Sequence, residues 1–236
     1  MARFRDISLC VLSMVQLLLP VQTDAQALNG DALERWFESD ELETPYEDRG
    51  GDGELQFLQP APDQKIPFSQ TNIHLTNTSH TDGWVSIEQC HEGLDPVPDA
   101  EVVYRFKQMR GLRVTKVENI KSVWIDGQSV QLKDVAKQAR LCLAFDAHSL
   151  LRREGGRYLL RYGPFQHRFL DSYFPMHILL TVDYSQSPLA LAAVTPLATE
   201  GYRLEQTAQR FSADAWFRGR LTIELQFQFT PRRRQR

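Results

Sequence analysis

Two cysteines with nearby histidines are the residues in this sequence best suited to chemistry. His91 follows Cys90 directly, and His148 lies six positions after Cys142. If the two segments lie side by side, they bring together two thiolates and two imidazoles, a ligand set that suits Zn²⁺ or copper. No short C-x-x-C or H-x-x-H spacing supports such a site, and one disulfide accounts for both thiols. We therefore predict a Cys90–Cys142 disulfide, with metal ligation by Cys90, His91, Cys142 and His148 as the alternative.

The second candidate is an aromatic stretch from Gly163 to Pro175. It lacks strand alternation and reads as a long loop, and such loops on rigid β scaffolds often bind partners. Aromatic rings with arginine are frequent at interface hot spots and on surfaces that stack sugars. The same rings could instead close one end of the core, and the sequence does not separate the two interpretations. The candidate partner-binding residues here are Phe165, His167, Arg168, Phe169, Asp171, Tyr173 and Phe174.

Enzymatic chemistry has little support in the residues. Ser172, His167 and Asp171 have the residue types of a hydrolase triad, but adjacent loop residues rarely align and no nucleophile elbow precedes Ser172. Phosphate-binding, dinucleotide and metalloprotease signatures are missing, so we predict no enzyme activity and no cofactor. The net charge of −3, from 27 basic and 30 acidic residues, provides no field that would recruit nucleic acid.

The segments that must position these residues read as β-strands. Apolar and polar residues alternate cleanly over residues 176–184 and 220–229. Asp126-Gly127, between two β-branched runs, predicts a tight hairpin. Helical periodicity is scarce, although Asp146 could cap a short helix through Leu151. Shorter strands are expected at 71–77, 84–91, 101–106, 112–118, 120–125, 128–132, 139–146, 157–162 and 189–194.

About eleven short strands without βα alternation predict an all-β fold, an antiparallel β-sandwich over residues 66–230. Its architecture is expected to be immunoglobulin-like. It is not a true immunoglobulin domain, because Arg140 rather than tyrosine stands two positions before Cys142. Simple alternation sets Cys142 opposite Leu141 and Leu143, and Cys90 opposite Ile87. The disulfide is therefore expected on the outer face of a sheet rather than between two sheets.

Residues 1–27 have the pattern of a signal peptide. Arg3 and Arg5 provide a positive start, an apolar run from Ile7 to Leu19 follows, and Ala25-Gln26-Ala27 has the small-residue spacing of a cleavage site. The run is too short for a bilayer-spanning helix, which needs about 20 residues. We expect cleavage near Ala27, a periplasmic or secreted location, and no transmembrane segment in the mature chain.

Residues 28–65 form an acidic arm, in which eleven acidic residues oppose three basic ones for a net charge of −8. This composition predicts a flexible segment, because it cannot bury enough apolar surface to offset chain entropy. Within the arm, Trp36 and Phe37 follow Ala32 and Leu33 at helical spacing. We expect a short amphipathic helix there, which docks on a partner or on the protein's own body. Residues 231–236 are a basic tail with four arginines.

Together these features predict an exported, non-enzymatic β-sandwich protein that binds or helps assemble a protein or glycan partner in the cell envelope. Its contact surfaces would be Trp36 with Phe37 and the stretch from Phe165 to Phe174. The alternative function is a periplasmic metal-handling protein that uses the Cys/His set. An enzyme would need a cleft in which histidine and carboxylate groups converge.

Overall fold

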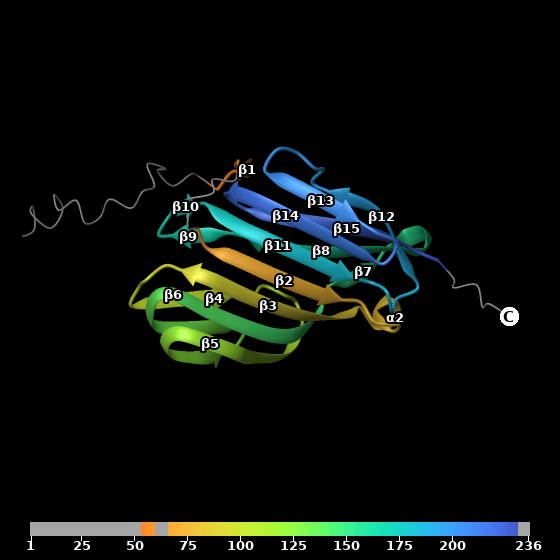
Figure 1. Ribbon diagram of the computed structural model, residues 1–236. Coiled ribbons are helices and arrows are strands. Elements are labelled where there is room, and N and C mark those ends of the chain that lie inside the picture. The colour runs from red at the N-terminus through yellow and green to blue at the C-terminus, as the bar shows by residue number, and fades with distance from the viewer. Residues whose placement is uncertain (1–52, 60–65, 231–236) are drawn as a thin grey trace, which may run out of the picture. The chain divides into compact units, whose positions relative to one another are not determined.

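The computed structural model describes residues 53–59 and 66–230, and these residues form two sheets packed face to face (Figure 1). The larger sheet has nine strands in the order β1-β14-β11-β2-β3-β6-β4, with β13 beside β14 and β5 beside β6. Its strands are β1 (Gln56–Phe57), β2 (Phe68–His74), β3 (Trp84–Leu94), β4 (Asp99–Val103), β5 (Met109–Asp126), β6 (Ser129–His148), β11 (Met176–Asp183), β13 (Tyr202–Gln206) and β14 (Arg210–Arg218).

The smaller sheet has four strands in the order β12-β15-β8-β7. They are β12 (Leu189–Thr195), β15 (Leu221–Phe229), β8 (Arg157–Phe165) and β7 (Leu150–Arg152). A separate hairpin joins β9 (His167–Phe169) to β10 (Ser172–Phe174), and the helices are α2 (Ser79–Asp82) and the 3-10 turn η2 (Glu154–Gly156). All pairings are antiparallel except that of β2 with β11, which is parallel.

The core lies between the facing sides of the two sheets. Alternate side chains of the strands supply the core, because successive side chains of a strand point to opposite faces of the sheet. Ile87 and Leu143 of the larger sheet and Phe227 of the smaller sheet are at most 1% exposed. The all-β sandwich predicted from the sequence is therefore confirmed, with one parallel pair that alternation does not reveal.

One polar cluster is buried within this apolar core. The Gln89 side-chain amide on β3 donates to Thr71 Oγ1 at 2.9 Å and to Ser69 Oγ at 3.2 Å, both on β2. Its carbonyl oxygen accepts a 2.6 Å hydrogen bond from the Tyr104 hydroxyl. Burial, followed by the electrostatic effect of Tyr162, raises the pKa of Tyr104 well above its usual value. These groups satisfy one another, which is the condition for burying polar atoms at low cost.

Several local predictions differ from the structure. The four strands expected between residues 112 and 146 merge into one long hairpin of β5 and β6, whose turn includes Gly127 as Asp126-Gly127 predicted. Register shifts interrupt the hairpin, and Asn119, Asp134 and Gln138 adopt left-handed φ along it. The helix expected from Asp146 to Leu151 is wrong, because β6 continues to His148 and β7 begins at Leu150.

The sandwich begins earlier in the chain than predicted. Residues 53–59 belong to the segment predicted to be a flexible arm, yet β1 pairs with β14 and the Leu58 amide donates to the Trp216 carbonyl. Gly219 approaches this segment so closely that a Cβ there would collide with the Glu54 carbonyl. Over the described residues, no helix is long and apolar enough to span a membrane.

Candidate functional site

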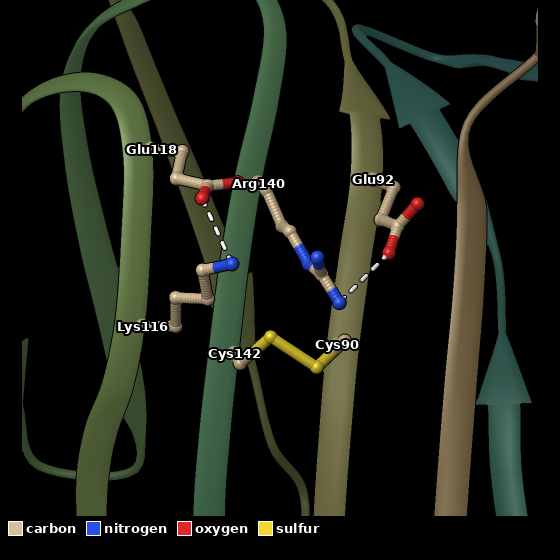
Figure 2. The surroundings of a disulfide bond; sticks show 6 residues. All are labelled: Cys90, Glu92, Lys116, Glu118, Arg140 and Cys142. Carbon is tan, nitrogen blue, oxygen red and sulfur yellow. Dashed lines mark ion pairs between the residues drawn. A yellow bond between two sulfur atoms is a disulfide. The ribbon is translucent and has the colours of Figure 1, made fainter.

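Cys90 and Cys142 form the disulfide that the sequence predicts. They lie directly opposite each other in the antiparallel register of β3 and β6. The bond is on the outer face of the larger sheet, because the neighbouring Leu141 and Leu143 point to the other side and are buried in the core. Figure 2 shows the Arg140–Glu92 and Lys116–Glu118 ion pairs beside the bond, at 3.2 and 2.8 Å. Both predictions, the pairing and the face, are confirmed.

The structure does not assemble the alternative metal site. The disulfide leaves neither cysteine as a thiolate, and a thiolate is the form that binds metal. His91 is paired with Leu141 and lies on the core side of β3, away from the sulfur atoms. His148 is opposite Trp84, six residues along β6 from Cys142 and about 20 Å away at the rise of a strand. No group of three metal-ligating side chains occurs within residues 53–59 and 66–230.

The burial of His91 makes the stability of the fold depend on pH. Its Nε2 is buried and has no hydrogen-bond partner among the described residues, and burial lowers its pKa to about 4. An unfolded chain takes up this proton near pH 6.5, whereas the folded protein does so only near pH 4. Stability is therefore fully present above pH 6.5 and should fall by at most about 3 kcal/mol as the pH drops from 6.5 to 4.

Urea unfolding at a series of pH values tests this expectation. His91→Met should flatten the slope of the wild-type profile between pH 6.5 and 4. If His91→Met leaves that slope unchanged, His91 does not titrate as a buried imidazole.

The second candidate, the aromatic stretch, is an ordered hairpin rather than an irregular loop. Its two strands pair Tyr173 with Arg168 and Phe174 with His167, and a two-residue turn at Leu170-Asp171 joins them. Alternation over three residues on each side is too short to recognise in the sequence. The hairpin follows β8 directly, at the end of the sandwich where Phe165 enters the core.

Specific contacts hold the base of the hairpin. The His167 ring contacts the Asp95 carboxylate through Nε2 at 2.8 Å and the Pro175 carbonyl oxygen through Nδ1 at 3.2 Å. The guanidinium groups of Arg168 and Arg220 each lie 5.9 Å from the centroid of the Tyr173 ring. These contacts fix the direction in which the turn projects from the sheets.

Two apolar side chains are exposed at the tip of the hairpin, beside the exposed carboxylate of Asp171. Phe169 is 58% exposed and Leu170 is 77% exposed. Leu170 also has a φ of 52°, a left-handed conformation that costs a residue with a Cβ about 1 kcal/mol. Arg168 braces the turn by donating to the Leu170 carbonyl and to Asp171 Oδ1, at 2.7 and 2.8 Å. Phe169 and Leu170 are thus exposed to solvent on a turn with a strained backbone. Neither the exposure of apolar groups nor the strain stabilises the fold, so this arrangement is typical of a functional surface.

The predicted site residues divide into three groups. Phe165 is 6% exposed and packs on Tyr162, so for this residue the core interpretation holds. The remaining members lie on the hairpin: His167, Arg168, Phe169, Asp171, Tyr173 and Phe174. Trp36 and Phe37 lie outside the described residues. Ser172, His167 and Asp171 do not form a catalytic triad. The His167 ring contacts Asp95 and the Pro175 carbonyl oxygen, whereas Asp171 forms an ion pair with Arg168.

Sequence reasoning missed several residues of this region. Leu170 is the most exposed apolar residue of the hairpin, and Asp95 and Arg220 reach the hairpin from distant parts of the chain. An apolar residue beside Asp171 at the centre of a short turn was the available signal for Leu170. No local pattern could have identified the other two, since their roles depend on contacts across many residues.

A polar and aromatic cluster around His177 lies on the outer face of the larger sheet. His177 Nε2 contacts Asp214 Oδ1 at 2.8 Å, and Arg203 donates to the other Asp214 oxygen at 2.6 Å. The His177 ring stacks on Trp216 with centroids 4.4 Å apart and tilts against Phe68 at 4.7 Å. These groups satisfy one another across adjacent strands and stabilise the sheet.

Comparisons with known proteins add little to this geometry. No family model matches the sequence, and no curated protein matches it. An M1 zinc metallopeptidase from Deinococcus radiodurans, bound to a tripeptide substrate, is similar in structure with 13% identity and a TM-score of 0.37 over 76% of this chain and 43% of that chain. A two-domain M1 zinc metallopeptidase bound to L-tryptophan gives 13% identity and a TM-score of 0.35, over 76% and 44%. The chain spans less than half the length of these structures.

Proposed function

We propose that this is an exported protein that binds a protein partner in the cell envelope through the tip of the β9–β10 hairpin. The observation that carries the proposal is the pair Phe169 and Leu170, exposed side by side on a braced turn. Exposed apolar groups on a rigid projection bury readily in a pocket of a partner, at little cost in conformational entropy. The signal-peptide pattern of residues 1–27 and the disulfide support export, because disulfides persist in oxidising compartments.

A protein partner fits the hairpin better than a glycan. Sugar rings stack on open aromatic faces, but Arg168 and Arg220 lie over the Tyr173 ring and Gly53 packs against its atoms. Leu170, the more exposed of the two apolar side chains at the tip, is aliphatic and offers no stacking face. Burial of an aliphatic and an aromatic group together is typical of protein interfaces.

The double variant Phe169→Thr with Leu170→Asn tests the proposal. Threonine keeps the strand, and asparagine tolerates the left-handed φ of position 170 better than leucine, so the fold should be retained. Capture of the envelope partner by the intact protein should fall at least about tenfold, since each lost apolar anchor weakens binding by about 1 kcal/mol or more. The measurement is quantitative pull-down with the intact protein from the envelope fraction.

The matched control replaces Leu197 and Val103, which are 78% and 52% exposed, by asparagine and threonine. This variant should capture the partner as the wild type does. Equal loss in both variants, or full retention in the hairpin variant, would contradict the proposal. The purified protein should also have the mass of residues 28–236 less two hydrogens, and a protein that retains residues 1–27 would contradict export.

A further inference from the structure

β12 forms one edge of the smaller sheet, and its outer side is open. Among the described residues it pairs with β15 on one side, and no backbone hydrogen bond reaches its other side. The N–H and C=O groups that point away from β15 are therefore free to bond to another strand. Ala192, Ala193 and Thr195 are exposed to solvent, so the described part of the chain does not cover this edge.

The absence of charge distinguishes β12 from the other edges. Charged side chains on an edge strand keep it from pairing with another sheet. Every other described edge strand of three or more residues in the two main sheets has them: Arg152 on β7, Asp99 and Glu101 on β4, Arg203 and Glu205 on β13, and several basic residues on β5. β12 has none, and no Asp, Glu, Lys, Arg or His occurs between Asp183 and Glu200, in a chain of which 24% of the residues are charged. The β12 edge is therefore the one left open to pairing.

A bulge makes the side-chain pattern of β12 symmetric about its centre. Leu191 and Val194 both pack against the core, although they lie three positions apart and the side chains of a regular strand alternate. The cause is a register shift at Ala192, where β12 has one residue more than β15. Ala190 and Thr195, the next residues outward on each side, lie on the opposite face of the sheet. The side chains of β12 thus follow the same order of faces from either end of the strand.

We propose that β12 pairs with β12 of a second copy of this chain, in antiparallel orientation about a two-fold axis between Ala192 and Ala193. An uncharged strand meets no like charge when it pairs with its own copy, whereas a strand with charges of one sign does. The two-fold axis satisfies the free backbone groups of both copies at once, because the same edge serves each. The smaller sheets of the two copies then form one continuous sheet.

The two-fold axis gives a register in which the faces match. Leu191 lies opposite Val194 of the second copy, and Ala190 lies opposite its Thr195. Opposed residues of an antiparallel pair share a face, so apolar side chains meet on the core side and small side chains meet on the outer side. A proline flanks β12 at each end. Because proline has no amide hydrogen, the pairing is confined to β12 itself.

The interface is small and separate from the β9–β10 hairpin. A strand of seven residues buries less surface than a standard protein interface, so we expect a dimer with a Kd of about 10 μM. The hairpin belongs to a different sheet, and the variant Phe169→Thr with Leu170→Asn should dimerise as the wild type does. The dimer does not depend on the hairpin's partner, and either proposal can fail alone.

Sedimentation equilibrium of the intact protein, at concentrations up to about 100 μM, measures the balance of monomer and dimer. The variant Ala192→Lys with Ala193→Lys places lysines opposite each other at the axis, which should weaken dimerisation at least about tenfold. Ala192→Glu with Ala193→Glu should have the same effect. An equimolar mixture of the two variants should recover the dimer, because each lysine then faces a glutamate.

The control variant, Ser122→Lys with Ala136→Lys, adds the same charge at exposed positions of the larger sheet. It should dimerise as the wild type does, and circular dichroism should show that every variant is folded. A wild type that stays monomeric at about 100 μM overturns the proposal, and the β12 edge is then open to a strand of another protein. A dimer that persists unchanged in the β12 lysine variant, equal loss in the control, or a mixture of lysine and glutamate variants that stays monomeric also overturns it.

Discussion

Replacing Cys90 and Cys142 together by alanine should lower the free energy of unfolding by about 4 kcal/mol. The bond closes a loop between cysteines 52 positions apart, so its removal frees the unfolded chain more than the folded one. The pairing of β3 with β6 is otherwise kept, and the variant should still fold at low temperature. The urea midpoint should fall by about 2 M, for an unfolding slope of about 2 kcal/mol/M.

Reduction provides an independent form of the same experiment. Wild-type protein unfolded in the presence of dithiothreitol should match the double variant. As a matched control on the same face, Lys116→Gln removes the exposed Lys116–Glu118 ion pair and should leave the unfolding midpoint almost unchanged. If reduction leaves the unfolding curve of the wild type unchanged, the disulfide does not form in solution or does not stabilise the fold.

Replacing Gln89 by methionine is expected to have the next largest effect, a loss of about 3 kcal/mol. Methionine keeps the length of the side chain but removes its donors and its acceptor. The Tyr104 hydroxyl, in a residue only 8% exposed, then loses the acceptor it reaches at 2.6 Å. Ser69 Oγ also loses its partner in a fully buried position. A buried polar group left without a partner costs about 1 to 3 kcal/mol.

A double-mutant cycle with Tyr104→Phe separates this effect from simple packing. Tyr104→Phe alone should cost about 1 to 2 kcal/mol, because it leaves the Gln89 carbonyl oxygen without a donor. In the Gln89→Met background the same change should cost much less or stabilise the protein, since no acceptor remains. Additive effects in the cycle would show that the two side chains act independently.

The strand pattern could be predicted where apolar residues are large. Residues 176–183 and 221–229 alternate bulky apolar and polar side chains, and both are strands with a buried face. β14 was missed although it lies within the larger sheet, between β11 and both β1 and β13. Its core positions include Ala213 and Ala215, whose short side chains give a weak periodic signal, and Asp214 and Trp216 alternate with them. Neighbouring strands, rather than its own hydrophobicity, specify this strand.

For the candidate sites too, local alternation predicted some features and not others. The face of the disulfide followed from alternation, because side chains two apart on a strand must share a face. Alternation could not assign the aromatic stretch between core and surface. The structure divides it, with Phe165 buried and Phe169 exposed, because β8 ends at Phe165 and the separate β9–β10 hairpin begins at His167. The metal alternative rested on proximity of four side chains that lie on opposite faces or far apart along one strand pair.

By itself, the sequence predicted the all-β class, the positions of the long alternating strands and the pairing of Cys90 with Cys142. These properties depend on the local period of side chains and on residues 66–230 containing two cysteines, Cys90 and Cys142. Only the tertiary structure decided that Leu170 stands exposed on a turn held by Arg168 and that Asp95 and Arg220 contact the hairpin. Exposure and such contacts are properties of a surface, and a surface exists only after residues distant in the chain have packed together.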